Sequence, residues 1–406
     1  MKQSSFPASL EDGLFGVFHM LTQQQIDLVK GTVPVLAEHG VALTTHFYAR
    51  MMKGNPELRQ VFNQGHQRAG RQQASLAGAV LAYAQNIENP AVLIDAVKHI
   101  ANKHASIGIR AEHYGIVGRH LLASIQEVLG DAATPELIDA WAAAYGQLAD
   151  LMIGLESDIY RQSALADGGW SVWRGFRIAE KKRETATVTS FVLVPVDGGP
   201  VMAVKPGQYI SVRLHVKSEN LVQPRQYTVT DAGERHRRIS VKRIAAAGDR
   251  PAGMVSNALH DEFAEGDLID VMPPLGEFVL QPERPAVFVS AGIGITPMVA
   301  MLRAAAAENR PVTFFHVCRD DNDFALGAEV REMMAGLADG RLVLRRTAVE
   351  GRPGDEDYAA LVRPDAVYYL CGPADFMKAA AAGLRKAGVA DADLRAELFG
   401  TGFLSL

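Results

Sequence analysis

The sequence predicts a multidomain protein in which an all-α domain, an antiparallel β-barrel and an α/β domain with a parallel sheet follow one another. Apolar residues recur at helical spacing from residue 21 to about 163. Period-two segments follow from residue 168, and from residue 285 short apolar runs alternate with helical stretches. We therefore expect domains at residues 21–164, 168–282 and 285–406.

Composition excludes several classes of protein. A chain of 406 residues is too long for one core. Its net charge of −5 provides no basic field for nucleic acid. The two cysteines, Cys318 and Cys371, are too few for a disulfide framework and indicate a reducing, cytoplasmic setting. No apolar run reaches the roughly eighteen residues of a membrane span, so stable membrane insertion is not expected.

Helix-start signals divide the all-α domain. Thr22–Gln25 has the form of a capping box. Asn55-Pro56-Glu57 and Thr134-Pro135-Glu136 each combine an N-cap residue, proline at the first helical position and an acid at the positive end of the helix. Residues 1–20 lack such a pattern, and we expect them to be a disordered extension or a tag outside the fold.

The barrel is predicted from alternation. After Asp167-Gly168-Gly169, apolar residues alternate with polar ones around Phe191 and again around Val212. Turn residues such as those of Asp197–Pro200 separate these short segments. Several short strands at close spacing indicate a small antiparallel barrel.

The last domain has the rhythm of a doubly wound sheet. Ala286–Ser290 is an apolar strand, followed by a glycine-rich turn and an alanine-rich helix through residue 307. Further strands are predicted at Val312–Val317, Leu342–Thr347 and Val367–Leu370, with helical stretches between them.

Two turns of this last domain suit a dinucleotide. Gly292-x-Gly294 follows a buried strand and precedes a helix predicted to start at Thr296-Pro297. Glycines let the backbone approach a pyrophosphate, and a helix N-terminus supplies free N–H donors. Cys371-Gly372-Pro373 ends a later strand at the same carboxyl edge. A purely structural glycine turn and a small buried Cys371 remain the alternatives.

Motifs of the barrel suit a flavin. In Arg225-Gln226-Tyr227-Thr228, Arg225 and Tyr227 point to one face of a strand, and an arginine can bind pyrophosphate in a bidentate manner. A surface arginine beside a strand tyrosine is the alternative. Gly253-Met254-Val255-Ser256-Asn257 offers a second turn-to-helix anion site, and Pro206-Gly207-Gln208-Tyr209 adds an aromatic face.

Histidines are frequent in the helical domain, and their spacing alone does not select a metal ligand. A lone helical histidine is more often a surface or core residue than a ligand. The candidates are His39, His46, His66, His99, His104, His113 and His120.

In their order along the chain, the motifs of the barrel and the α/β domain resemble the ferredoxin–NADP reductase superfamily. The resemblance implies Arg225 on the FAD pyrophosphate, Tyr227 and Thr228 at the flavin ring, Ser256 near a phosphate and an aromatic Phe399 over the flavin. Phe399-Gly400 is followed by Thr401 where the family often has proline, which puts the path of the tail in doubt. The cofactor-binding residues implied are Tyr209, Arg225, Gln226, Tyr227, Thr228, Gly253, Val255, Ser256, Asn257, Phe399, Gly292, Gly294, Thr296, Pro297, Cys371, Gly372 and Pro373.

Motifs of the helical domain resemble the globin domain of bacterial flavohaemoglobins. They are Thr45-His46-Phe47-Tyr48, Asn55-Pro56-Glu57-Leu58, Val61-Phe62, Asn86-Ile87-Glu88-Asn89 and Lys103-His104-Ala105-Ser106. The resemblance implies that His104 is the proximal iron ligand. It also implies Tyr48 and Gln72 on the distal side, Leu76 closing the pocket above the iron, Phe62 against the porphyrin, Tyr114 and Glu156 around His104, and Lys103 among the cofactor-binding residues.

These roles are chemically reasonable. A carboxylate that accepts the proximal imidazole N–H raises the basicity of the ligand and favours O2 activation over reversible carriage. A distal phenol can donate to bound oxygen. From the residues alone, Tyr48 could equally be a core aromatic and Glu156 a solvated helix acid.

The resemblance implies a cytoplasmic, monomeric nitric oxide dioxygenase with haem b, FAD and NAD(P)H. NAD(P)H reduces FAD, FAD reduces the haem iron, and the haem with O2 bound converts NO to nitrate. One alternative is an O2- or lipid-binding protein, with a lipid in the distal pocket, whose reductase only keeps the iron ferrous. Another is a flavin reductase with a vestigial globin domain. The choice between NADH and NADPH stays open, because Arg319 suits a 2′-phosphate while Asp320 and Asp321 disfavour one.

Overall fold

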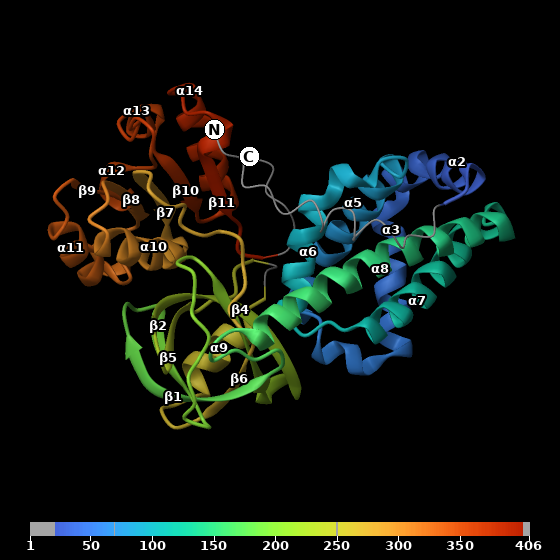
Figure 1. Cartoon of the computed structure of the whole chain (residues 1–406), viewed down its shortest axis with the longest axis horizontal. Helices are drawn as coiled ribbons and strands as arrows, with labels where there is room; N and C mark the ends of the chain where they lie inside the picture. The colour runs from blue at the N-terminus through green and yellow to red at the C-terminus, as the bar shows by residue number, and fades with distance from the viewer. Residues whose placement is uncertain (1–20, 69, 249–250, 401–406) are drawn as a thin grey trace. The chain divides into compact units, whose positions relative to one another are not determined.

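The computed structural model describes residues 21–68, 70–248 and 251–400 (Figure 1). The predictions for residues 1–20 and for the tail beyond Gly400 lie outside these ranges. The chain divides into two compact units, of which the first ends at Ala164 and the second begins at Leu165. Within the described ranges, no helix combines the length and apolar character that crossing a membrane requires.

The first unit is helical, as predicted. Its longer helices carry the candidate haem residues except Phe62, which follows η1, and short 3-10 turns connect some of these helices. The elements are α2 (Gln23–Gly31), α3 (Val33–Gly54), η1 (Pro56–Gln60), α4 (Gln64–Arg68), α5 (Arg71–Gln85), η2 (Pro90–Leu93), α6 (Ile94–Ser106), α7 (Ala111–Leu129), η3 (Gly130–Ala132) and α8 (Pro135–Leu165).

The capping predictions are confirmed at two helix starts and in part at the third, where Pro56 and Glu57 occupy the first turn as predicted. Thr22 caps α2 with a complete capping box, and the Thr134 hydroxyl accepts the Leu137 N–H at 3.3 Å. Asn55 forms no side-chain cap, and η1 after it is a 3-10 turn. The Asn55 amide donates to Glu57 at 2.6 Å instead, and its oxygen contacts the His120 ring at 2.9 Å, so its side chain is engaged elsewhere.

The second unit begins with the predicted antiparallel barrel. Its six strands close in the order β1-β2-β5-β4-β3-β6 around a core that includes Phe176, Phe191 and Ile239. Helix α9 covers the barrel with Val255 and Leu259. The elements are β1 (Arg174–Arg183), β2 (Val188–Pro195), β3 (Tyr209–Val216), η4 (Lys217–Glu219), β4 (Leu221–Gly233), β5 (His236–Lys242), α9 (Met254–Asp261) and β6 (Leu268–Val271).

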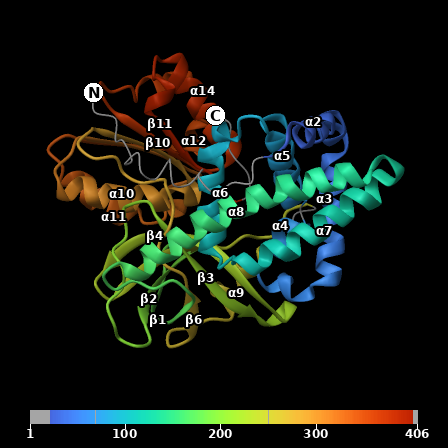
Figure 2. The ribbon, with the colours of Figure 1, turned by 45° about the vertical axis from the view of Figure 1, so that its right-hand side comes forward.

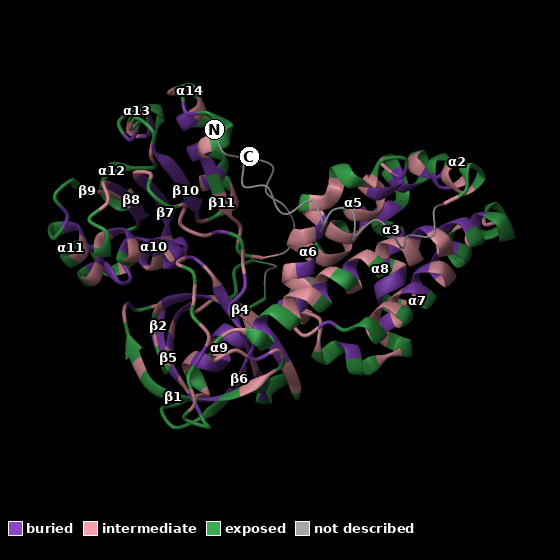
Figure 3. Ribbon diagram, in the orientation of Figure 1, coloured by how far each residue is buried: buried purple, intermediate pink, exposed green. Residues whose placement is uncertain are grey.

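The rest of the second unit is a five-stranded parallel sheet in the order β11-β10-β7-β8-β9. Figure 2 shows α10 and α11 on one side of the sheet and α14 on the other. Because both faces are covered, β7, β8 and β10 are buried throughout (Figure 3). The elements are β7 (Ala286–Ala291), η5 (Gly292–Gly294), α10 (Ile295–Ala307), β8 (Val312–Cys318), η6 (Asp321–Asp323), α11 (Gly327–Ala335), β9 (Gly340–Arg346), α12 (Thr347–Glu350), α13 (Asp355–Ala359), β10 (Val367–Cys371), α14 (Ala374–Lys386), η7 (Asp391–Asp393) and β11 (Leu394–Glu397).

Strands β7, β8 and β10 each end one residue later than predicted, and larger differences occur at β9 and β11. The strand predicted at Leu342–Thr347 runs from Gly340 to Arg346, and Thr347 begins α12. Strand β11 was not predicted, because Leu-Arg-Ala-Glu is only four residues long. This segment becomes a strand because it pairs with β10 in a parallel register.

Candidate functional site

Three helices bring the proximal residues together. Helix α6 carries His104, α7 carries Tyr114 and α8 carries Glu156. His104 Nδ1 lies 2.9 Å from Glu156 Oε1 and 3.0 Å from the Tyr114 hydroxyl oxygen. Tyr114 donates its own O–H to the same carboxylate oxygen at 2.5 Å. Burial, together with the Glu156 charge and hydrogen bond, raises the pKa of Tyr114, so the phenol keeps its proton.

The carboxylate of this triad is buried, whereas the histidine is not. The Glu156 side chain is 3% exposed and that of His104 35% exposed. A buried carboxylate that binds one ring nitrogen leaves the opposite nitrogen, Nε2, as the one available to a metal. Among the described residues, no group of three or more histidine, cysteine, aspartate or glutamate side chains is placed to hold a metal ion.

Two tyrosines that we did not single out from the sequence hold this arrangement. Tyr145 of α8 donates to the Tyr114 carbonyl oxygen at 2.7 Å. Tyr160, one turn after Glu156, donates to the Ile109 carbonyl oxygen at 2.5 Å. The i, i+4 spacing of Glu156 and Tyr160 on one helix was the available signal.

The predicted distal residues gather in the main core of the first unit. Tyr48 is buried, its ring centroid lies 6.2 Å from that of Phe62, and Leu76 packs against the same cluster. Burial raises the pKa of Tyr48. Among the described residues, neither the Tyr48 hydroxyl nor the buried Gln72 Oε1 has a hydrogen-bond partner. Polar groups of this kind are normally satisfied, so they fit a pocket that receives a ligand.

An apolar pocket opens in the first unit between α3, α5, α7 and α8. Its lining includes Leu36, Leu43, Val80, Leu121, Ile125 and Trp141. Such a lining suits a small apolar gas.

In the barrel, Arg225 is a half-buried cation on a strand that faces the predicted flavin site. It lies on β4 with Tyr227 two residues on, so both share a face of the strand, as predicted. Within the described ranges Arg225 has no carboxylate partner, and its Nη1 donates to the Pro224 carbonyl oxygen at 2.6 Å. Burial lowers the pKa of Arg225 to about 10. A half-buried, uncompensated guanidinium fits a pyrophosphate.

Neighbouring barrel residues complete this face. Thr228 and Tyr209 are buried and face each other across β3 and β4, while Gln226 and Tyr227 are half-buried. Gly276 packs against the Tyr209 ring, because a Cβ there would lie 3.0 Å from it.

The second predicted anion site forms the N-terminus of α9. Gly253 is the N-cap, and the Ser256 hydroxyl donates to its carbonyl oxygen at 3.2 Å. The Asn257 amide donates to Ile244, whereas its buried Oδ1 has no partner among the described residues. Val255 lies in the barrel core at 1% exposure, so only its backbone can reach a cofactor.

The nucleotide turn is built by close approach of two loops. Helix α10 begins at Ile295, one residue before the predicted Thr296-Pro297 start, and Gly292–Gly294 form a 3-10 turn. A Cβ on Gly294 would lie 2.2 Å from the Cys371 carbonyl oxygen, and one on Gly372 3.2 Å from Ala291 Cβ. The carboxyl ends of β7 and β10 therefore meet where the sequence places the glycine motif and Cys371-Gly372-Pro373.

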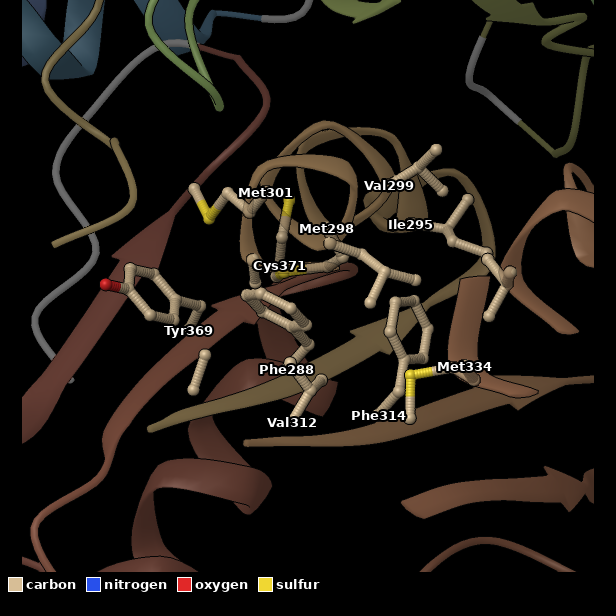
Figure 4. Close-up of a cluster of buried hydrophobic side chains, with 14 of the residues drawn as sticks. Phe288, Ile295, Met298, Val299, Met301, Val312, Phe314, Met334, Tyr369 and Cys371 are labelled. Atoms are coloured by element: carbon tan, nitrogen blue, oxygen red, sulfur yellow. The ribbon is translucent and has the colours of Figure 1, made fainter. Parts of the chain in front are cut away.

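Within this turn the thiol of Cys371 points away from the surface. Figure 4 shows Cys371 among Met298, Phe288 and Tyr369, and the residue is fully buried. Burial raises the thiol pKa well above its ordinary value. The side chain of Cys371 is therefore a small buried core residue, and only the Cys371 backbone borders the turn.

One further residue borders the nucleotide turn. Lys242, which we did not select, ends β5 with its Nζ 3.8 Å from where a Gly292 Cβ would stand. Arg319 is 77% exposed and only 3.6 Å from Asp320, whereas Asp321 pairs with arginines of α11 and β9. Phe399 is 43% exposed. Lys103 of α6 is half-buried.

Comparison with known proteins agrees with this architecture. Residues 45–152 match the globin family, residues 176–280 the oxidoreductase FAD-binding domain and residues 288–382 the oxidoreductase NAD-binding domain. Together with the hydrogen-bonded triad of His104, Tyr114 and Glu156, these domains define a haem- and flavin-dependent redox enzyme.

The relatives name the family. The flavohemoprotein of Bordetella pertussis is 51% identical over 402 residues, covering 94% of this chain and 99% of that protein. That of Chromobacterium violaceum is 50% identical over 404 residues with the same coverage. The crystal structure of flavohemoglobin from Malassezia yamatoensis, with bound FAD and heme, superposes with a TM-score of 0.84 at 30% identity over 94% of this chain and all of that one. The chain belongs to the flavohemoprotein family.

Proposed function

We propose that the protein is a nitric oxide dioxygenase that works in the cytoplasm as a monomer and uses NAD(P)H and O2 to convert NO to nitrate. Conversion of one NO and one O2 to one nitrate requires one electron. Because NAD(P)H supplies two electrons, one NAD(P)H supports two turnovers. When bound, FAD divides the electron pair of NAD(P)H into single electrons and haem provides the iron at which O2 and NO react.

The observation that supports this proposal is the bond between His104 and Glu156. His104 would hold the iron through Nε2, while Glu156 holds the Nδ1 proton and so increases the electron density that the imidazole donates. A protein that only carries O2 reversibly does not need this additional electron donation to the iron. Tyr48 would donate its hydroxyl to the distal ligand, with Gln72 beside it and with Phe62 and Leu76 excluding water.

In the second unit, we assign Arg225 and the N-terminus of α9 to the FAD phosphates and Tyr209, Tyr227 and Thr228 to the flavin ring. The turn Gly292–Gly294 and the backbone of Cys371-Gly372-Pro373 would receive the nicotinamide nucleotide. The free, buried thiols of Cys318 and Cys371 support a reducing compartment.

The decisive experiment follows NADH, O2 and NO consumption together with nitrate formation. The proposal predicts two nitrates per NADH, and a His104→Ala variant that retains FAD should produce none. NADH oxidation that NO does not accelerate would instead support the second candidate, an O2- or lipid-binding protein. The apolar pocket lined by Leu43 and Val80 is the observation that favours that candidate.

A further inference from the structure

Four charged side chains join the barrel to the nucleotide-binding sheet. Arg238 of β5 donates two hydrogen bonds to Glu329 of α11, at 2.6 and 2.8 Å. Arg303 of α10 donates to the same carboxylate at 2.9 Å and lies 3.2 Å from Asp231 of β4. We call this set, Asp231, Arg238, Arg303 and Glu329, the interdomain latch.

The latch is more than a surface ion pair. The Arg238 and Glu329 side chains are only 13% and 24% exposed, and Thr230 accepts a further hydrogen bond from Arg238 at 3.0 Å. Although burial opposes ionisation, the arginines hold the pKa of Glu329 below its ordinary value. Each domain supplies one acid and one base, and two of the ion pairs, Arg238–Glu329 and Arg303–Asp231, cross from one domain to the other. Bidentate, partly buried pairs are geometrically specific and weakly screened.

The elements that carry the latch also carry the cofactor motifs. Strand β4 holds Arg225–Thr228 and, three residues later, Asp231. Helix α10 starts at the Gly292–Gly294 turn and carries Arg303 eight residues after its first residue. Between them, Met301 of α10 packs on Gly207 of the barrel, where an added Cβ would lie 2.5 Å from Met301 Cε. One strand and one helix therefore connect the latch to both proposed binding faces.

We propose that the interdomain latch is a positioning device that sets the nicotinamide turn at the correct distance from the flavin face. The proposal rests on the NAD(P)H-to-FAD half of the proposed function. In that step NADH transfers a hydride, two electrons with one proton, to FAD and becomes NAD⁺, while a second proton from water completes FADH2. Hydride transfer needs close contact of the two rings, so small shifts of α10 lower its rate.

The test uses full-length holoprotein with Glu329→Gln, which keeps the shape of the side chain and removes its charge. The matched control is Asp270→Asn, which breaks a pair of similar length (Arg213–Asp270, 2.7 Å) inside the barrel. For Glu329→Gln we expect the rate constant of flavin reduction at saturating NADH to fall about tenfold, with FAD content unchanged. Amide hydrogen exchange of residues 295–307, measured without nucleotide, should accelerate in Glu329→Gln and not in the control.

Arg303→Gln provides a second variant in case Glu329→Gln does not fold, because Arg303 is 44% exposed. It should change both readouts in the same direction. Wild-type reduction rates in either folded variant, or unchanged exchange of α10, would overturn the proposal. Because flavin reduction is measured without NO, loss of the latch effect and absence of nitrate formation are separate results.

Discussion

At the scale of single residues, the haem-binding half of the molecule depends on which side chain supplies each hydrogen bond. Glu156 is occupied by His104 and Tyr114, whereas Tyr48 has its hydroxyl available. The hydroxyl of Tyr83, in contrast, is not available, because it donates to the Ala144 carbonyl oxygen at 3.0 Å. We therefore propose different roles for these two buried tyrosines, Tyr48 toward a ligand and Tyr83 toward the fold.

Replacing Tyr48 by phenylalanine tests the distal assignment. The ring and its packing on Phe62 remain, so stability should change little. Loss of one donor to bound oxygen costs about 1–3 kcal/mol, or roughly ten- to hundredfold in O2 affinity. Stopped-flow measurement should show faster O2 release and slower NO turnover with unchanged flavin reduction. Tyr83→Phe is the matched control, and equal O2 release in wild type and Tyr48→Phe would make Tyr48 a packing residue.

Replacing Arg225 by alanine tests the flavin face. A charge-assisted bond to pyrophosphate contributes about 1.5–3 kcal/mol, so the dissociation constant of FAD should rise by roughly ten- to hundredfold. Haem content should not change, and Arg213→Ala, which removes an arginine already paired with Asp270, should retain FAD. FAD titration by fluorescence gives the constant, and simultaneous loss of both cofactors would indicate misfolding.

At the scale of elements, the turn between β7 and α10 requires glycine for close approach. Gly294 has an ordinary φ of −61°, so its backbone conformation would tolerate a side chain. The surrounding space would not tolerate one, because an added Cβ would lie only 2.2 Å from the Cys371 carbonyl oxygen. The two carboxyl-edge loops can meet only because one of them lacks a side chain.

Gly294→Ala should therefore force the two loops apart and destabilise the second unit by about 1–3 kcal/mol, as overpacking does. NADH affinity should weaken together with stability. Gly154→Ala in α8 provides the contrast, because nothing lies within 4 Å of its Cβ position, and helix propensity should stabilise that variant by about 0.5–1 kcal/mol. Urea unfolding and NADH titration measure both effects. A neutral Gly294→Ala would show that the loops can separate freely.

At the scale of the whole molecule, each unit has its own core, and a buried histidine makes the second unit sensitive to acid. His316 is fully buried, stacks on Phe324 at 5.1 Å and hydrogen-bonds Ser290 at 2.8 Å. Burial lowers its pKa from 6.5 to about 3. The unfolded chain therefore binds a proton below pH 6.5 that the folded chain binds only near pH 3, and stability falls as the pH decreases through this window.

The variant His316→Gln tests whether His316 causes this loss of stability at acid pH. Wild-type unfolding free energy should decrease with falling pH by up to about 1.4 kcal/mol per unit more than that of the variant between pH 6.5 and 3. Unfolding of the second unit, followed by FAD fluorescence at several pH values, measures the two slopes. His215→Gln replaces an exposed histidine of the barrel and should keep the wild-type slope. Parallel slopes for wild type and His316→Gln would contradict the assignment.

The sequence by itself determined the three fold classes, the capping box at Thr22 and the position of the glycine turn, because periodicity, caps and turns depend on neighbouring residues. Only the tertiary structure decided which residues far apart in the chain meet. Glu156 is 52 residues from His104, and Glu329 is 91 residues from Arg238. It also decided that the Cys371 thiol is buried and that Asn55 caps no helix, since both outcomes depend on side chains that other elements bring near.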